Sequence, residues 1–284
     1  MEIESVGNYR ARWGEGPLWW SESLYFVDIE EHKVLRYHPC SGEEQIWDVG
    51  ERVGTVVPRR GGGLAIAGDR GFAFLDPGSG EITRLGDPEA GKPDNRFNDG
   101  KCSPDGRFFA GTISLVKNEG DAALYRLDAD QSITKVYDGV TNSNGIVWTE
   151  DGRTLYYIDT PRRAVLAFDY DSDTGTLTNE RVAFSTSGDS DGVPDGMAID
   201  TEGHLWIAFC HGGCVVCFDQ AGREMRRLDF PCREVTAPAF GGEGLRDLYV
   251  TSGIPKDEIE KEAGRLFVVR NLGATGLPAN GFAG

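Results

Sequence analysis

Apolar and polar positions along the chain repeat one pattern six times. Each copy is a turn-forming stretch followed by a short alternating strand that opens with leucine or phenylalanine. A repeat period in the forties with several strands per unit is typical of a β-propeller, so six copies predict six blades. The opening residues, 40 to 50 positions apart, are Leu24, Leu64, Phe108, Leu155, Leu205 and Leu248.

The fourth repeat contains the strand pattern of a complete blade. The fourth repeat shows four apolar runs separated by turn residues, and Asp-Gly steps such as Asp151-Gly152 between alternating runs are strong hairpin signals. The prediction is an all-β, six-bladed propeller with four antiparallel strands per blade, formed by residues 1–284 as a single domain. The four runs are Gly145–Trp148, Thr154–Asp159, Val165–Tyr170 and Arg181–Ser185.

The sixth repeat lacks an outer strand of its own. After Val269 the chain is rich in Gly and Pro and poor in strand-forming residues. The N-terminal stretch Glu2–Tyr9 precedes the first blade and can supply the missing strand. Pairing it with the last blade would close the ring and remove two exposed sheet edges.

Composition and charge exclude several kinds of partner. The 284 residues are 39% hydrophobic, which is enough for a packed core, and the net charge is −17. That charge argues against nucleic-acid binding, which needs clustered Lys and Arg. No apolar run approaches the ~18 residues that span a bilayer, and the N-terminus does not read as a secretory signal. We therefore expect a cytoplasmic protein that acts on a small molecule without contacting a membrane.

The cysteines include one cluster with the composition of a metal site. Cys210, His211, Cys214 and Cys217 lie close together in the sequence. Within a strand, however, Cys214 and Cys217 would point to opposite faces, and His211 falls beside glycines in a hairpin turn. Reduced, buried cysteines are the favoured interpretation over a zinc site.

The repeat spacing also brings scattered polar residues into one ring. The first strand of each blade lines the axis, so equivalent positions near its start meet at one channel mouth. Four of the six positions carry oxygen donors, and desolvated carboxylates that converge there would need a divalent cation. Ca²⁺, Mg²⁺, Mn²⁺, Zn²⁺ and Fe²⁺ all suit such donors. Counting back nine to eleven residues from each opening residue gives Glu15, Thr55, Asn98 with Asp99, Asn144, Asp195 and Pro238.

A simpler interpretation remains open for each of these residues. Asn144-Gly145 and Asp195-Gly196 are ordinary turn dipeptides. A metal site is favoured because these residues occupy the equivalent position in four repeats, whereas other turns of the chain do not fall at that position. Thr55 and Pro238 offer no strong ligand and would leave room for a substrate.

Four segments resemble the SMP-30/regucalcin/gluconolactonase/luciferin-regenerating-enzyme family: GEGPLWW, RFNDGKCSPDGRFFAGT, SNGIVWTEDGRTLYYIDT and PDGMAIDTEGHLWIAFCHGG. The resemblance implies a six-bladed propeller with one divalent metal in the axial channel. By the same resemblance Glu15, Asn144 and Asp195 are the metal ligands, and Arg96 and Asn98 contact the substrate. Asp99 either orients Asn98 or caps the turn at Gly100, and Arg96 has the alternative of an exposed loop arginine.

One segment departs from the family pattern. Many members carry an acidic substrate contact soon after a G-T-M motif, where this chain has Ser114 or Leu115; Glu119 would have to serve from a longer loop. The departure leaves the identity of the substrate open.

The resemblance and the ring together predict metal-dependent hydrolysis of a sugar lactone, with Asp195 as general base. Two alternatives are another metal-dependent hydrolase, similar to a phosphotriesterase, and a non-enzymatic calcium-binding protein similar to regucalcin. No Ser-His-Asp system is visible. The histidines, which are expected to be structural or exposed, are His32, His38, His204 and His211.

Overall fold

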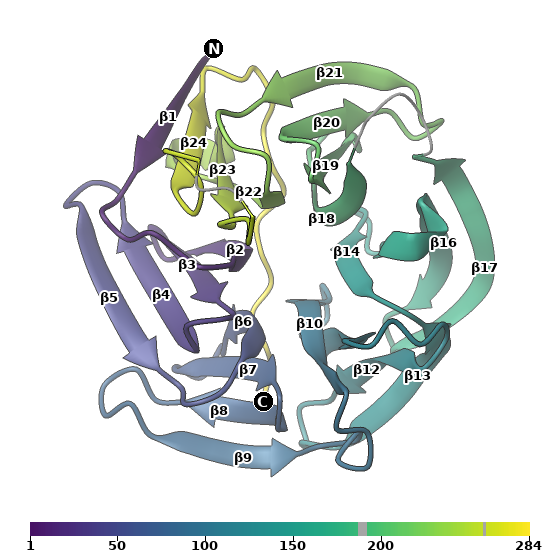
Figure 1. Cartoon of the computed structure of the whole chain (residues 1–284). Helices are drawn as coiled ribbons and strands as arrows, with labels where there is room; N and C mark the ends of the chain where they lie inside the picture. Colours follow the sequence, from purple (N-terminus) through teal and green to yellow (C-terminus); the bar gives the residue numbers. More distant parts are fainter. Residues whose placement is uncertain (187–191, 258–259) are drawn as a thin grey trace.

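Six four-stranded antiparallel sheets are arranged as a ring around a central axis (Figure 1). A computed structural model describes residues 1–186, 192–257 and 260–284. The predicted six-bladed propeller is confirmed. Helix in these residues is limited to two 3₁₀ turns, η1 (Thr160–Arg162) and η2 (Glu243–Leu245), and no helix is long and apolar enough to cross a membrane.

In the first five blades the strands run in chain order from the axis outward (Figure 1). The first three blades contain β2 (Gly14–Trp20), β3 (Ser23–Asp28), β4 (Lys33–His38) and β5 (Glu43–Asp48); β6 (Val53–Pro58), β7 (Leu64–Gly68), β8 (Gly71–Leu75) and β9 (Ile82–Gly86); and β10 (Asn95–Cys102), β11 (Phe108–Ser114), β12 (Ala122–Leu127) and β13 (Ile133–Val140). The next two contain β14 (Ser143–Trp148), β15 (Thr154–Asp159), β16 (Ala164–Asp171) and β17 (Thr176–Ser185); and β18 (Val193–Ile199), β19 (Leu205–Cys210), β20 (Cys214–Phe218) and β21 (Glu224–Asp229).

The sixth blade joins the two ends of the chain. It contains β22 (Val235–Gly241), β23 (Asp247–Ser252), β24 (Leu266–Arg270) and, as its outer strand, β1 (Glu2–Val6). β1 pairs antiparallel with β24 from Glu2 opposite Arg270 to Val6 opposite Leu266, as the sequence predicted. The strand is shorter than expected because Gly7 has a φ of +71°, which ends the extended conformation.

The core lies between neighbouring blades. All residues of β7, β8, β19 and β20 are buried, whereas the outer strand β21 is mostly exposed. Cys214 packs in the cluster between the fourth and fifth blades and Cys217 in the cluster between the fifth and sixth, so the two face opposite ways as predicted. All six cysteines are free thiols, and only Cys40 is exposed.

The C-terminal segment 271–284 closes one end of the channel. Figure 1 shows it as the yellow coil that crosses the middle of the ring and ends near β7. Gly276 bridges to Asp200 just after β18, and Phe282, which is fully buried, bridges to Arg59 just after β6. Both partners follow the last residue of an inner strand. The opposite mouth, where the inner strands begin, is not crossed by this segment.

Candidate metal centre at the channel mouth

Every inner strand departs from regular pairing at the same level. The register between first and second strands shifts once in each blade, for example between Asn144 and Ile146 and between Pro194 and Met197. A bulge leaves a residue unpaired and re-aims its side chain. Six bulges at one level place six residues of the inner strands around the same mouth.

The observed register gives the equivalent position in each blade. In each blade, one residue of the inner strand pairs with the residue four positions after the opening Leu or Phe of the second strand, and the ring position is the next residue. The inner-strand residues that pair in this way are Gly14, Val53, Phe97, Ser143, Pro194 and Val235. The ring therefore contains Glu15, Gly54, Asn98, Asn144, Asp195 and Thr236.

The predicted ring positions in the second and sixth blades, Thr55 and Pro238, were wrong by one and two residues. The first hairpin differs in length between blades, and in the sixth blade it is extended by η2, so a count of nine to eleven residues does not reach Thr236. Gly54 is required for packing, because a Cβ atom there would lie 2.3 Å from the Asn98 carbonyl oxygen. The second blade thus brings its backbone, rather than a side chain, to the ring.

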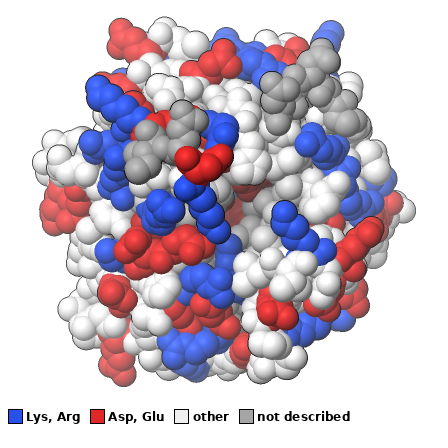
Figure 2. Space-filling model, in the orientation of Figure 1, with Lys and Arg blue, Asp and Glu red and all other residues white. Residues whose placement is uncertain are grey.

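Three carboxylates meet at this mouth. Glu15, Asp99 and Asp195 are only 5%, 7% and 6% exposed. Burial raises the pKa of Glu15 and of Asp195 well above the usual range, and repulsion from Asp99 raises both further. Figure 2 shows the face of the ring as seen in Figure 1, with a central hollow and Lys and Arg side chains around it.

The asparagines form one hydrogen-bonded chain across two blades. Asn98 Nδ2 donates to Ser143 O at 2.7 Å and to Asn144 Oδ1 at 2.9 Å, and Asn144 Nδ2 donates to Thr160 Oγ1 at 2.7 Å. Thr160 Oγ1 donates its single hydrogen to Pro194 O, so it must accept from Asn144. This fixes the Asn144 amide, and its Oδ1 remains an acceptor on the side of Asn98.

Arg96 is a buried residue of β10, not an exposed loop arginine. Its side chain is 8% exposed, and one terminal nitrogen, Nη1, donates to Phe97 O and to Asn98 Oδ1, both at 2.8 Å. Arg96 Nε is buried without a partner among the described residues. Burial lowers the pKa of Arg96 to about 10, so it remains a cation at neutral pH with a donor still available.

Asp99 caps the backbone at Gly100, one of its two predicted roles. Gly100 N donates to Asp99 Oδ1 at 2.7 Å, and burial raises the pKa of Asp99 while the Lys101 ammonium lowers it. Lys101 points along the channel, where its Nζ donates to Met197 O at 3.0 Å. Its charge is therefore engaged below the ring and does not fully offset three carboxylates.

The donor set suits a hard or borderline divalent cation. Glu15, Asn144 and Asp195 offer oxygen atoms only, from two carboxylates and one amide. Buried carboxylates with unmatched charge are costly unless a cation compensates them. The residues of the mouth therefore fit the metal that the family resemblance implies.

Sequence and structure comparisons agree on the relationship. The sequence pattern described as the SMP-30/Gluconolactonase/LRE-like region matches residues 13–254. The chain belongs to this family. It is 41% identical to regucalcin of Danio rerio and 35% identical to regucalcin of Homo sapiens, over 100% of this chain and 99% of each relative.

Solved structures of family members have the same fold. A luciferin-regenerating enzyme superposes with a TM-score of 0.92 at 29% identity and covers 99% of both chains. A protein described as the calcium-binding protein regucalcin from Agrobacterium tumefaciens gives a TM-score of 0.92 at 26% identity, over 98% of this chain and 96% of its own.

The segment that departs from the family pattern lies at the same mouth. Ser114, the last residue of β11, is buried, and its Oγ accepts from Asn118 N at 3.1 Å. Leu115 and Glu119 are exposed in the following loop, where the charge of Glu119 acts on Asp159. The loop has one other acidic residue, Asp121, whose carboxylate pairs with Lys92 at 3.0 Å.

Two residues that contact the ring were missed from the sequence. Thr160 lies in η1, and Cys210, at the end of β19, lies near Asp195, whose charge adds to the effect of burial in raising the pKa of the Cys210 thiol. Cys210 pairs with Val193, two residues before Asp195, so the register of the β18–β19 hairpin was the signal that could have identified it.

Proposed function

We propose that the protein is a metal-dependent lactonase that hydrolyses a sugar lactone to the sugar acid. The proposal rests on two features of one channel mouth. Three carboxylates are buried there, and a buried arginine has no partner for its Nε within the described part of the chain. The first feature requires a divalent cation and the second offers a donor to an oxygen-rich ligand.

The proposed ligands of the ion are Glu15, Asn144 and Asp195. When bound, the ion would supply Lewis acidity toward a carbonyl oxygen and lower the pKa of a coordinated water. The candidates are Ca²⁺, Zn²⁺, Mn²⁺, Mg²⁺ and Fe²⁺, all of which accept oxygen donors.

Asp195 is proposed as the general base. Its carboxylate would take a proton from the attacking water, whose oxygen bonds to the acyl carbon of the lactone. The ring C–O bond then breaks, and the ring oxygen becomes a hydroxyl when it receives a proton. The product is an open-chain sugar acid with one water added.

Arg96 and Asn98 are proposed to position the substrate. Arg96 Nε can donate to a hydroxyl or to the developing oxyanion, and the bond from its Nη1 to Asn98 Oδ1 holds the two side chains in a fixed relation. Replacement of Arg96 by Lys would keep the charge but lose the planar set of donors.

The direct test is a panel of lactones assayed with several metals. Chelated protein would be reconstituted with each divalent ion and given xylono-, glucono-, galactono- and arabinono-lactone, with a phosphotriester as a separate arm. We expect lactone turnover that chelation removes. Full activity without metal would end the Lewis-acid account, and turnover of the phosphotriester alone would favour the phosphotriesterase-like alternative.

A second candidate is a calcium-binding protein without catalytic activity. It is favoured by the description of the Agrobacterium tumefaciens relative as calcium-binding. Calcium binding at Glu15 and Asp195 together with no turnover of any lactone by any metal form would support this candidate over the lactonase.

A further inference from the structure

A second group of metal-ligand side chains lies behind Asp195, where the fifth and sixth blades meet. Cys210 ends β19, His211 follows it in the turn, and Glu234 immediately precedes β22. Cys210 and Glu234 form an isolated antiparallel bridge. The backbone therefore brings the three residues together although Glu234 is distant in sequence.

The three ligand atoms are already close to the spacing of a zinc site. Cys210 Sγ lies 3.3 Å from Glu234 Oε2, His211 Nδ1 lies 2.7 Å from the same oxygen, and Sγ and Nδ1 are 4.0 Å apart. Tetrahedral zinc with its usual Zn–S, Zn–N and Zn–O bonds would separate such atoms by about 3.3–3.6 Å. Small side-chain adjustments would complete that geometry.

The hydrogen bonds of this group can be replaced by an ion. Glu234 Oε2 accepts from Cys210 Sγ, from the ring of His211 and from His211 N at 3.2 Å. Two of these three donors are the other proposed ligands, which exchange a proton for a metal when they coordinate. Arg233 Nε lies 3.3 Å from Oε1 and leaves Oε2 to the group.

The group is reached from outside. The His211 side chain is 57% exposed while that of Glu234 is 3% exposed. His211 borders a surface cavity of about 360 Å³ that also contacts Gly213, Arg233 and Glu260, so an ion can reach this side chain from solvent. One thiolate and one carboxylate would balance the charge of a divalent ion.

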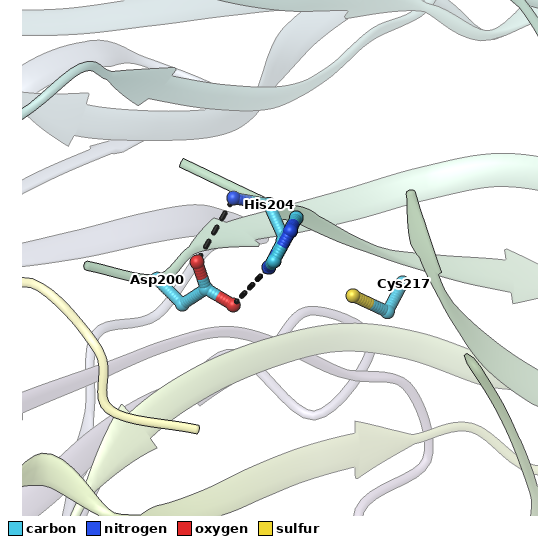
Figure 3. A group of neighbouring side chains, drawn as sticks. All are labelled: Asp200, His204 and Cys217. Carbon is cyan, nitrogen blue, oxygen red and sulfur yellow. Dashed lines mark hydrogen bonds and ion pairs between the residues drawn. The ribbon is translucent and has the colours of Figure 1, made fainter. Parts of the chain in front are cut away.

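A second cluster of similar composition serves as a contrast (Figure 3). Asp200, His204 and Cys217 also lie within reach of one another. Asp200, however, accepts from Glu202 N, His204 N, Trp206 Nε1 and His204 Nδ1, at 2.9 to 3.2 Å. Two of these donors are backbone amides and one is an indole, which cannot give way to a metal, so this carboxylate is already saturated.

We propose that Cys210 Sγ, His211 Nδ1 and Glu234 Oε2 bind a thiophilic divalent cation of the zinc class, separate from the oxygen-lined site at the channel mouth. Binding releases the thiol proton of Cys210 to solvent and leaves His211 as a neutral ligand. Soft sulfur and imidazole donors select zinc-like ions over calcium or magnesium.

Cobalt(II), as a zinc substitute, tests this proposal through the thiolate-to-cobalt charge-transfer band. The full-length protein would first be saturated with Ca²⁺, and Co²⁺ then titrated in. We expect one Co²⁺ per chain with a thiolate band that His211→Ala weakens, because the proposed ligands at the mouth, Glu15, Asn144 and Asp195, carry no sulfur. Absence of the band would overturn the proposal and leave the lactonase proposal unaffected.

Substitutions of single side chains identify the residues that produce the charge-transfer band. Cys210→Ser is expected to abolish it, whereas Cys214→Ser, a matched change at a buried cysteine of the same blade, is expected to retain it. His211→Ala changes an exposed side chain and is expected to weaken Co²⁺ binding at least ~10-fold without loss of the fold. A band that persists in Cys210→Ser, or that disappears only in Cys217→Ser, would refute this assignment.

Discussion

Asp195 and Asp200 stand at opposite ends of β18 and are almost equally buried, at 6% and 3% exposed. Asp200 is saturated: Oδ1 accepts from Glu202 N and His204 N, both at 2.9 Å, and Oδ2 accepts from Trp206 Nε1 at 3.0 Å. His204 Nδ1 adds a fourth contact at 3.2 Å. The fold itself supplies all the partners this carboxylate needs.

Asp195 receives no backbone N–H from any residue that the structure describes. Its neighbours Asp99 and Glu15 repel its negative charge, and the Arg96 guanidinium favours its ionised form. Burial therefore does not separate a structural aspartate from a functional one. The difference lies in whether the chain satisfies the charge, and an unsatisfied carboxylate indicates a ligand from outside the chain.

The largest effect is expected from Asp195→Asn, which changes the carboxylate at the channel mouth. The amide cannot act as a general base, so we expect kcat/KM for the best lactone to fall by ~10³-fold or more while the fold is retained. Steady-state kinetics with circular dichroism would measure both. The control is Asp200→Asn at the other end of the strand, for which the folded fraction should keep normal turnover. Unchanged kcat/KM in Asp195→Asn would remove Asp195 from the mechanism.

For Asp200→Ala we expect a loss of stability rather than a loss of turnover. Loss of the carboxylate leaves two backbone amides and the Trp206 indole without a buried acceptor, and we expect a loss of about 3 kcal/mol in unfolding free energy. Urea denaturation would measure it. Asp151→Ala is the matched control, because Asp151 serves the corresponding hairpin of the fourth blade from an exposed position. Equal losses in the two variants would contradict the structural role of Asp200.

The sequence was enough to predict the strands, the closure of the ring and four of the ring residues. Alternating apolar runs with Asp-Gly turns specify strands locally, so β15 has its predicted bounds, Thr154–Asp159. The unpaired edge of the last blade was enough to predict its pairing with the N-terminal strand. Glu15, Asn98, Asn144 and Asp195 also occupy the predicted phase, because each inner strand makes the same bulge.

What the sequence could not provide depends on contacts between blades. Thr236 replaces Pro238 in the ring because the hairpin of its blade is longer. Glu234 reaches Cys210 across a blade boundary, and the path of the C-terminal segment over the channel depends on the burial of Phe282. None of these contacts leaves a periodic signal in the chain.

The stability of metal-free protein should respond to pH through the buried carboxylates of the channel mouth. Burial and mutual repulsion raise the folded-state pKa of Glu15 and Asp195, so their contribution to stability is complete below the unfolded-state pKa and is lost as pH rises through the folded values. We expect the Tm of chelated protein to fall as pH rises above the unfolded-state pKa of these carboxyl groups and they ionise in the folded state.

A bound divalent ion should reverse this trend. At ~100 times its Kd a ligand adds about 2.7 kcal/mol, and the gain should be larger at the higher pH, where the carboxylates are ionised. Calorimetry with and without Ca²⁺ would measure both effects. Asp195→Asn should flatten the pH profile and Asp200→Asn should not. A profile that rises with pH in chelated protein would contradict the unsatisfied charge at the mouth.

The smallest effect is expected from His204→Ala, at the saturated end. His204 Nδ1 makes the longest of the four contacts to Asp200, at 3.2 Å, and its side chain is 23% exposed, so solvent can replace it. The two backbone amides and the indole remain in place. We therefore expect a loss of about 1 kcal/mol or less in urea denaturation and no change in kcat/KM. A fall in kcat/KM would mean that the two ends of β18 are coupled through the strand, and a loss as large as that of Asp200→Ala would mean that the imidazole, rather than the backbone amides and the indole, holds this carboxylate.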